Sequence, residues 1–183
     1  MAYLYLVGSM PNAVAIGALI GTCFAFAWAI AGAQGLGSQW RGPAVAIAAT
    51  VSVSIGATVM WRSRFVHAVA TPSSFNGAVY GWAVTLESLA IVITVIALRR
   101  RGHSEYIMPS VAFIVGAHFF GLARAMISGG GRVFIWIGGL MCISAAVIIF
   151  ALARSLVSSA QSMAVTGFSC AIILWAAAVS TLI

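Results

Sequence analysis

The chain consists almost entirely of six long apolar runs, and this pattern constrains its fold more than any other feature. Each run holds about 20 residues, the length that an α-helix needs to cross a bilayer. The runs are Asn12 to Ala33, Pro43 to Trp61, Ala78 to Leu98, Pro109 to Ile127, Val133 to Ala153 and Met163 to Ile183. They are continuous rather than alternating, which disfavours the strands of a membrane barrel. The sequence therefore predicts an all-α fold: one polytopic membrane helix bundle of six transmembrane helices, covering residues 1–183 as a single transmembrane domain.

The composition excludes a water-soluble globular protein. Of the 183 residues, 63% are hydrophobic and only 6% are charged, whereas an average soluble domain has about 25% charged residues. Six spans use about 120 residues, so no separate soluble domain fits beside them. The first ten residues lack a basic stretch, and a removable signal peptide is not expected. The lipid bilayer is therefore the expected surrounding of a multi-pass membrane protein.

The charged residues are nearly all arginines, and they lie mainly between the apolar runs. The formal net charge is +7, with nine Arg, no Lys and two Glu. Arginines at helix ends anchor the helices in lipid headgroups, so the basic excess does not indicate a nucleic-acid partner. Five arginines follow the first, third and fifth spans, and three follow the second and fourth. By the positive-inside rule, the side with Arg99, Arg100 and Arg101 is cytoplasmic and both termini are external.

Small residues recur every four positions in three spans, which predicts close helix packing. These stripes are Ala13, Gly17, Gly21, Ala25, Ala29 and Ala33; then Ala44, Ala48, Ser52 and Gly56; then Ala117, Gly121 and Ala125. Helices gain little from the hydrophobic effect against one another in lipid, so close backbone approach drives their association. The stripes favour packing within the chain. A stripe that this packing leaves uncovered is a candidate seam for a homo-oligomer or a larger membrane complex.

Three hydroxyl residues follow the same four-residue spacing in the second span: Thr50, Ser54 and Thr58. One interpretation is that these hydroxyls bond back to carbonyls of their own helix, which requires no ligand. The other is that they form a polar wall of an internal cavity. The first is favoured, because hydroxyls commonly hold helices together in membranes.

One acidic and one imidazole side chain are expected to meet in the middle of the membrane. Glu87 lies nine residues after Ala78, about 13 Å along a helix, and His118 lies nine residues after Pro109. Their spans are consecutive and joined by a short connection, so the two helices are expected to be antiparallel neighbours. An unpaired carboxylate at this depth costs at least about 2.5 kcal/mol. Burial and pairing act in opposite directions on both groups, so the pair can change protonation near neutral pH.

Tyr80 and Thr94 lie seven residues on either side of Glu87 and share its helical face. Together with Glu87 and His118 they form a candidate site for protons or a small substrate, with Tyr80 and Thr94 flanking the centre. The alternative is structural, with Glu87 as a neutral acid that locks two helices together through one or two hydrogen bonds. The two interpretations are about equally supported, because intramembrane ionisable residues are often functional but one carboxylate is a modest signal.

Arg124 is the remaining charged candidate. It lies about 22 Å along the fourth span, from where its guanidinium can reach the far headgroups by snorkelling. Snorkelling is the favoured interpretation. The alternative is a contact with an anion or with Glu87, although Arg124 points about 120° away from His118 around the helix.

No cofactor or metal is expected. His67, His103 and His118 occupy three levels more than 10 Å apart by helix rise, whereas the ligands of one metal ion must converge. Cys23, Cys142 and Cys170 share no motif spacing and are expected as reduced core residues. Enzymatic chemistry is also disfavoured, since it usually needs several convergent polar groups, and the chain offers few.

The segment from Gly116 to Arg124, Gly-Ala-His-Phe-Phe-Gly-Leu-Ala-Arg, resembles a G-x-H-F-x-x-L-A-R stretch of uncharacterised bacterial integral membrane proteins of this size. Those proteins often have proline where this chain has Gly121, and the match covers one span of six. The resemblance implies a bacterial cytoplasmic membrane and draws attention to His118 and Arg124, but it brings no known activity.

Two functions from different classes fit these observations. In the first, the protein is a transporter or channel that moves protons or a small solute through the Glu87 and His118 centre. In the second, it is a non-catalytic subunit or assembly partner in a larger membrane complex, docked through its small-residue stripes. Purification in native form discriminates between the two.

Overall fold

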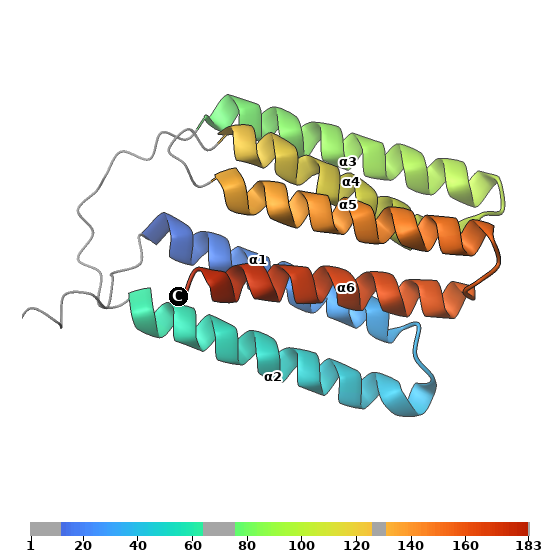
Figure 1. Ribbon diagram of the computed structural model, residues 1–183, viewed down its shortest axis with the longest axis horizontal. Helices are drawn as coiled ribbons and strands as arrows, with labels where there is room; N and C mark the ends of the chain where they lie inside the picture. The colour runs from blue at the N-terminus through green and yellow to red at the C-terminus, as the bar shows by residue number, and fades with distance from the viewer. Residues whose placement is uncertain (1–11, 64–75, 126–130, 183) are drawn as a thin grey trace, which may run out of the picture.

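The computed structural model describes residues 12–63, 76–125 and 131–182, and six α-helices make up nearly all of them (Figure 1). The helices are α1 (Asn12–Ala33), α2 (Ser38–Ser63), α3 (Gly77–Arg100), α4 (Ile107–Ala125), α5 (Gly131–Ala153) and α6 (Ser159–Ser180). A short 3-10 helix, η2 (Ser104–Tyr106), precedes α4. All six α-helices are long and apolar enough to cross a membrane. The predicted all-α fold of six helices is confirmed, and the chain is a multi-pass membrane protein.

Two helices begin four or five residues earlier than the apolar runs predict. α2 begins five residues before Pro43, which lies inside its first turns. A proline there removes one backbone donor near the helix start without preventing the helix. α6 begins four residues before Met163, because Ser158 and Gln161 form a capping box. The Ser158 hydroxyl accepts from the Gln161 N–H at 3.2 Å, and the Ser158 N–H donates to Gln161 Oε1 at 2.8 Å.

The helices pack in an order that leaves α2 and α3 at opposite edges of the bundle (Figure 1). α6 packs against α1 and α5 and also touches α4, so it is the most buried helix. α3 packs on α4, and none of its residues is buried. The connections α1–α2, α3–α4 and α5–α6 all lie at one end of the bundle, together with Arg99, Arg100 and Arg154. We call this end the Arg99 end.

Glycines allow α1 and α6 to pack with their backbones in contact. A Cβ atom added to Gly167 would lie 2.6 Å from the carbonyl oxygen of Trp28, and one added to Gly35 would lie 2.6 Å from the amide nitrogen of Ala164. Real Cβ contacts are essentially never shorter than 3.0 Å. The distances leave no room for a side chain, so these glycines determine how closely the two helices approach.

The small-residue stripe of α1 is only partly used for packing inside the chain. Its second half is covered, because Ala25, Ala29 and Ala33 are fully buried. Its first half is open, since a Cβ atom added to Gly17 or Gly21 would meet nothing within 4 Å. The expectation of packing within the chain is therefore correct for Ala25, Ala29 and Ala33, whereas a side chain at Gly17 or Gly21 would meet none of the described helices. The side chain of Ala13 lies outside the described part of the chain.

The hydroxyls of α2 bond to their own helix, as the favoured interpretation predicted. Thr50 Oγ1 donates to the Ala46 carbonyl at 3.0 Å, and Thr58 Oγ1 donates to the Ser54 carbonyl at 2.8 Å. Thr50, Ser54 and Thr58 are all exposed on the outer face of α2. They do not line an internal cavity. A different hydroxyl, Ser52, connects two helices by accepting a bond from Trp175 Nε1 of α6 at 3.0 Å.

The three cysteines have free thiols, but only Cys170 is a buried core residue. Cys142 is half-buried and donates a weak hydrogen bond to the Phe113 carbonyl at 3.5 Å. Cys23 is exposed on α1, so its assignment to the core was wrong. Cysteine has no charge and packs as a small apolar group, which makes it acceptable on a helix face turned toward lipid.

Candidate functional site

The candidate site lies where α3 crosses α4, and small residues bring the two helices close together there. A Cβ atom added to Gly121 of α4 would lie 3.0 Å from the Cβ of Ala83 on α3. Ala83 and Glu87 are one helical turn apart and lie on the same face of α3. The close approach at Gly121 therefore directs the Glu87 side chain to the seam between the helices.

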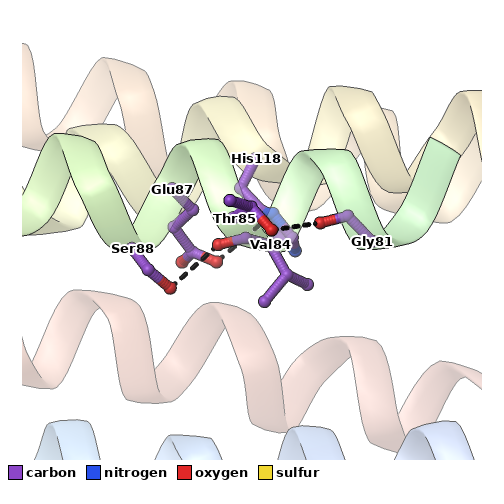
Figure 2. Close-up of polar contacts among 6 residues, drawn as sticks. All are labelled: Gly81, Val84, Thr85, Glu87, Ser88 and His118. Carbon is purple, nitrogen blue, oxygen red and sulfur yellow. Dashed lines mark hydrogen bonds and ion pairs between the residues drawn. The ribbon is translucent and has the colours of Figure 1, made fainter. Parts of the chain in front are cut away.

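Glu87 and His118 meet at this seam, as the sequence predicts. Glu87 Oε2 lies 3.3 Å from His118 Nδ1 (Figure 2). The His118 side chain is 9% exposed and the Glu87 side chain 18%. The carboxylate is thus the outer member of the pair and the imidazole the inner one. The distance is that of an ion pair when His118 is protonated.

The contact is not aligned as a hydrogen bond. His118 Nδ1 is buried and has no hydrogen-bond partner among the residues that the structure describes. A buried polar atom without a partner costs about 1–3 kcal/mol. The pair is therefore brought together by helix packing, and the imidazole nitrogen retains the capacity to bind a proton or a donor.

Both side chains lie far from either end of the bundle. Glu87 is ten residues after Gly77, which corresponds to about 15 Å along α3. His118 is eleven residues after Ile107, about 16 Å along α4. In a hydrocarbon layer about 30 Å thick these positions are close to the midplane. The prediction of a shared depth is confirmed by the contact itself.

The hydroxyls nearest to Glu87 on α3 are already bonded to their own helix (Figure 2). Thr85 Oγ1 donates to the Gly81 carbonyl at 2.8 Å, and Ser88 Oγ donates to the Val84 carbonyl at 2.9 Å. Each hydroxyl has one proton to donate. Neither residue therefore donates a hydrogen bond to the Glu87 carboxylate, which leaves His118 as its polar contact in Figure 2.

Tyr80 and Thr94 share the α4-facing side of α3 with Glu87 but lie about 10 Å along the helix from it in opposite directions. Tyr80 is 43% exposed and Thr94 is half-buried. Tyr80, Glu87 and Thr94 form a strip along α3, which lies at the edge of the bundle. The strip does not run through the centre of the bundle, because α4 is the α-helix on which α3 packs. Their role as flanking groups stays a prediction.

Arg124 lies in the last turn of α4, six residues beyond His118, and its side chain is exposed. The ion pairs among the described residues are Glu87 with His118 and Glu105 with His103, so Arg124 takes part in neither. Its position at the helix end suits the snorkelling interpretation. Within the described ranges, no group of three His, Cys, Asp or Glu side chains is placed to hold a metal ion.

Sequence reasoning missed two buried hydroxyls in α6. Ser162 and Thr166 are each 1% exposed, and neither hydroxyl has a hydrogen-bond partner among the described residues. Their four-residue spacing is the same signal that singled out Thr50, Ser54 and Thr58 in the second span. Residue spacing alone does not show which face of a helix is covered by a neighbouring helix. What distinguishes Ser162 and Thr166 from the hydroxyls of α2 is that their face is covered.

No protein-family model, no curated protein and no solved structure matches the chain. The resemblance of the Gly116 to Arg124 segment to bacterial membrane proteins therefore stays a prediction.

Proposed function

We propose that this membrane protein moves protons, alone or together with a small solute, through the Glu87 and His118 centre. The observation that carries the proposal is the 3.3 Å contact between a carboxylate and an imidazole near the middle of two membrane-spanning helices. Charged or titratable groups at this depth are costly and are usually functional. The bacterial cytoplasmic membrane is the proposed location, with the Arg99 end on the cytoplasmic side.

The chemistry of the pair suits a proton that is held and then passed on. When the pair holds one proton, it is neutral overall, whether that proton is on His118 beside a carboxylate or on Glu87 beside a neutral imidazole. Transfer between Glu87 Oε2 and His118 Nδ1 therefore leaves the net charge in the membrane unchanged. Gain or loss of a second proton does change it, and a charge in hydrocarbon is costly. The neutral pair is thus the resting state, and the charged states are the transient ones of a transport cycle.

Tyr80, Thr94 and Arg124 belong to the proposal in secondary roles. Tyr80 and Thr94 continue the polar side of α3 toward its two ends, and Arg124 lies beyond His118 at the end of α4. Each is about 9–10 Å of helix rise away from the pair. At that distance the three side chains do not contact the Glu87 carboxylate. Their proposed role is to bind solute or water on its way to the centre.

Proton movement by the unmodified protein is the first test. Purified protein is reconstituted into liposomes containing a pH-sensitive dye, and a potassium diffusion potential drives protons inward. We expect acidification faster than in protein-free liposomes of the same lipid. Dicyclohexylcarbodiimide, which modifies protonated carboxyls in apolar surroundings, is expected to stop it. Acidification at the protein-free rate, with and without an added small solute gradient, would contradict the proposal.

A second candidate function is supported by the uncovered helix surfaces. None of the residues of α3 is buried, and the Gly17 and Gly21 pair on α1 has no neighbour within 4 Å of an added Cβ atom. Small residues on a lipid-facing helix permit close packing with another helix. A non-catalytic subunit of a larger membrane complex, or a homo-oligomer, would cover these surfaces.

Native purification separates this second candidate from the first. The protein is extracted from its own membrane in a mild detergent and its particle mass is measured by light scattering. A subunit is expected to leave the membrane with stoichiometric partners, or as a defined oligomer. Recovery as a single chain under every mild condition would rule the second candidate out.

A further inference from the structure

Three buried side-chain atoms have no hydrogen-bond partner in the part of the chain that the structure describes: His118 Nδ1, Ser162 Oγ and Thr166 Oγ1. The two hydroxyls differ from those elsewhere in the bundle. Thr22, Thr85 and Ser88, for example, donate to the carbonyl four residues earlier, at 2.8–2.9 Å. Ser162 and Thr166 are more deeply buried than any of these and make no such bond. Buried hydroxyls that are left free in this way commonly bind water.

A hollow lies at the Arg99 end of the bundle, next to the start of the helix that carries the two hydroxyls. The hollow has a volume of about 720 Å³ and is lined by residues 104–106 of η2, residues 155–158 of the α5–α6 connection, and Leu152, Ser159, Gln161 and Met163. Most of the lining groups from η2 and the connection carry hydroxyls, and Glu105 adds a carboxylate. Ser162 stands between the lining residues Gln161 and Met163. The hollow is therefore a polar entrance at the start of α6.

The two hydroxyls lie one turn apart on a buried face of α6. Ser162 is three residues into α6, about 5 Å, and Thr166 is about 10 Å into it. Cys170, one further turn along the same face, packs in one cluster with Ala112 of α4 and Met141 of α5. Ser162 and Thr166 are therefore buried inside the bundle and do not face lipid.

His118 lies at the next level along this direction. α4 and α6 both begin at the Arg99 end (Figure 1), and His118 is about 16 Å along α4. The two free hydroxyls thus lie about 5 and 10 Å along α6, and His118 lies about 16 Å along α4, each counted from the helix start at the Arg99 end. These values are rises along two helices that pack against each other, α6 and α4, and water molecules bridge polar groups that are too far apart for a direct hydrogen bond.

We propose that the hollow between η2 and the α5–α6 connection is the aqueous mouth of the Glu87 and His118 centre, and that Ser162 and Thr166 bind the water molecules that lead inward from it. Protons then reach the pair from the Arg99 end. The assignment of this water path to transport rests on the proposed function, whereas the binding of water by Ser162 and Thr166 does not.

Cysteine substitution with silver ions as the probe tests the proposal. Cys23, Cys142 and Cys170 are first replaced by alanine, and then Ser162→Cys or Thr166→Cys is introduced. Each protein is placed in lipid nanodiscs, so that both membrane faces are accessible, and exposed to Ag⁺ in chloride-free buffer. Ag⁺ is close to water in size and reacts with the thiolate, which forms in water and not in lipid. The thiol that remains is titrated after denaturation in detergent.

Two further variants provide matched controls on the same helix. Ser159→Cys lies in the hollow and is exposed, so it reacts in any case. Ile172→Cys lies on the outer face, where Ile172 is 60% exposed to the surroundings of the bundle. We expect Ser162→Cys and Thr166→Cys to react at least about tenfold faster than Ile172→Cys, because only a hydrated thiol ionises readily.

The outcomes separate the water path from the transport function. Reaction of Ser162→Cys and Thr166→Cys no faster than that of Ile172→Cys, in proteins that elute as a single peak, overturns the proposal. Fast reaction in a protein that moves no protons supports the water path and removes the transport function. Ser162→Cys is nearly isosteric with the native residue, so it tests the proposal even where Thr166→Cys fails to fold.

Discussion

Replacement of Gly167 by valine is expected to prevent the native contact between α1 and α6. The first added carbon would lie 2.6 Å from the Trp28 carbonyl oxygen and even closer to the backbone of Gly32. These neighbours are backbone atoms of a helix and cannot rotate away as a side chain would. Overpacking in a protein core typically costs about 1–3 kcal/mol and occasionally more. A clash with backbone is expected at or above the upper end of that range.

The measurement is the yield of monodisperse protein after detergent extraction, together with its thermal unfolding. Gly139→Val is the matched control, because a Cβ atom at Gly139 would meet nothing within 4 Å. It introduces the same β-branched residue into a membrane helix without the clash. We expect Gly139→Val to behave like the unmodified chain and Gly167→Val to aggregate or unfold at a much lower temperature. Equal unfolding temperatures for the two variants would show that α1 and α6 do not pack through Gly167.

The packing of α1 also shows what the sequence can and cannot predict about helix contacts. The four-residue stripe correctly predicted that Ala25, Ala29 and Ala33 face another helix. It pointed equally to Gly17 and Gly21, which the described helices leave uncovered, and it did not include Gly32. A periodic pattern identifies a helix face, but not the partner helix. Gly167, which makes the closest approach to α1, is distant in the chain and lies in a face of small residues, Ala160, Ala164, Gly167 and Ala171, whose spacing of four, three and four departs from the strict four-residue stripe.

The helices themselves were predictable for two reasons. The thickness of the membrane fixes the length of a spanning segment, and the backbone of that segment needs internal hydrogen bonds. A run of about 20 apolar residues has to form a helix in lipid, where every backbone polar group must be bonded internally. The ends were less predictable, because they depend on local contacts. At α6 the start is determined by the hydrogen bonds between Ser158 and Gln161, and not by hydropathy.

The central pair of the candidate site was predictable for a similar reason. Consecutive spans with a short connection are adjacent, and equal distance from their ends places Glu87 and His118 at one depth. The position of α3 at the edge of the bundle was not predictable, and it leaves Tyr80 exposed where the sequence suggested an inward-facing strip. The deep burial of Ser162 and Thr166 was missed because it depends on how other helices pack around α6.

Glu87→Gln is expected to reduce proton movement to the rate of protein-free liposomes. The amide has nearly the same shape as the carboxyl group but cannot release or accept the transported proton. It can still donate a hydrogen bond to His118 Nδ1, which is otherwise unpartnered among the described residues. The free energy of unfolding is therefore expected to change by no more than about 1 kcal/mol, the net contribution of one hydrogen bond. The yield of folded protein is expected to stay close to that of the unmodified chain.

Thr85→Val is the matched control for Glu87→Gln, because Thr85 lies half a turn away on the same helix. Its hydroxyl is bonded to the Gly81 carbonyl and makes no contact with the pair. We expect proton movement in Thr85→Val at the rate of the unmodified protein.

The two variants also separate function from structure at Glu87. If Glu87 acts only as a neutral lock between α3 and α4, Glu87→Gln retains both the fold and whatever proton movement the protein has, because glutamine has nearly the same shape and can donate a hydrogen bond to His118. Unchanged acidification in Glu87→Gln would thus assign the carboxyl group to helix packing, whereas loss of acidification in a stably folded variant requires that the group itself gains and loses the proton.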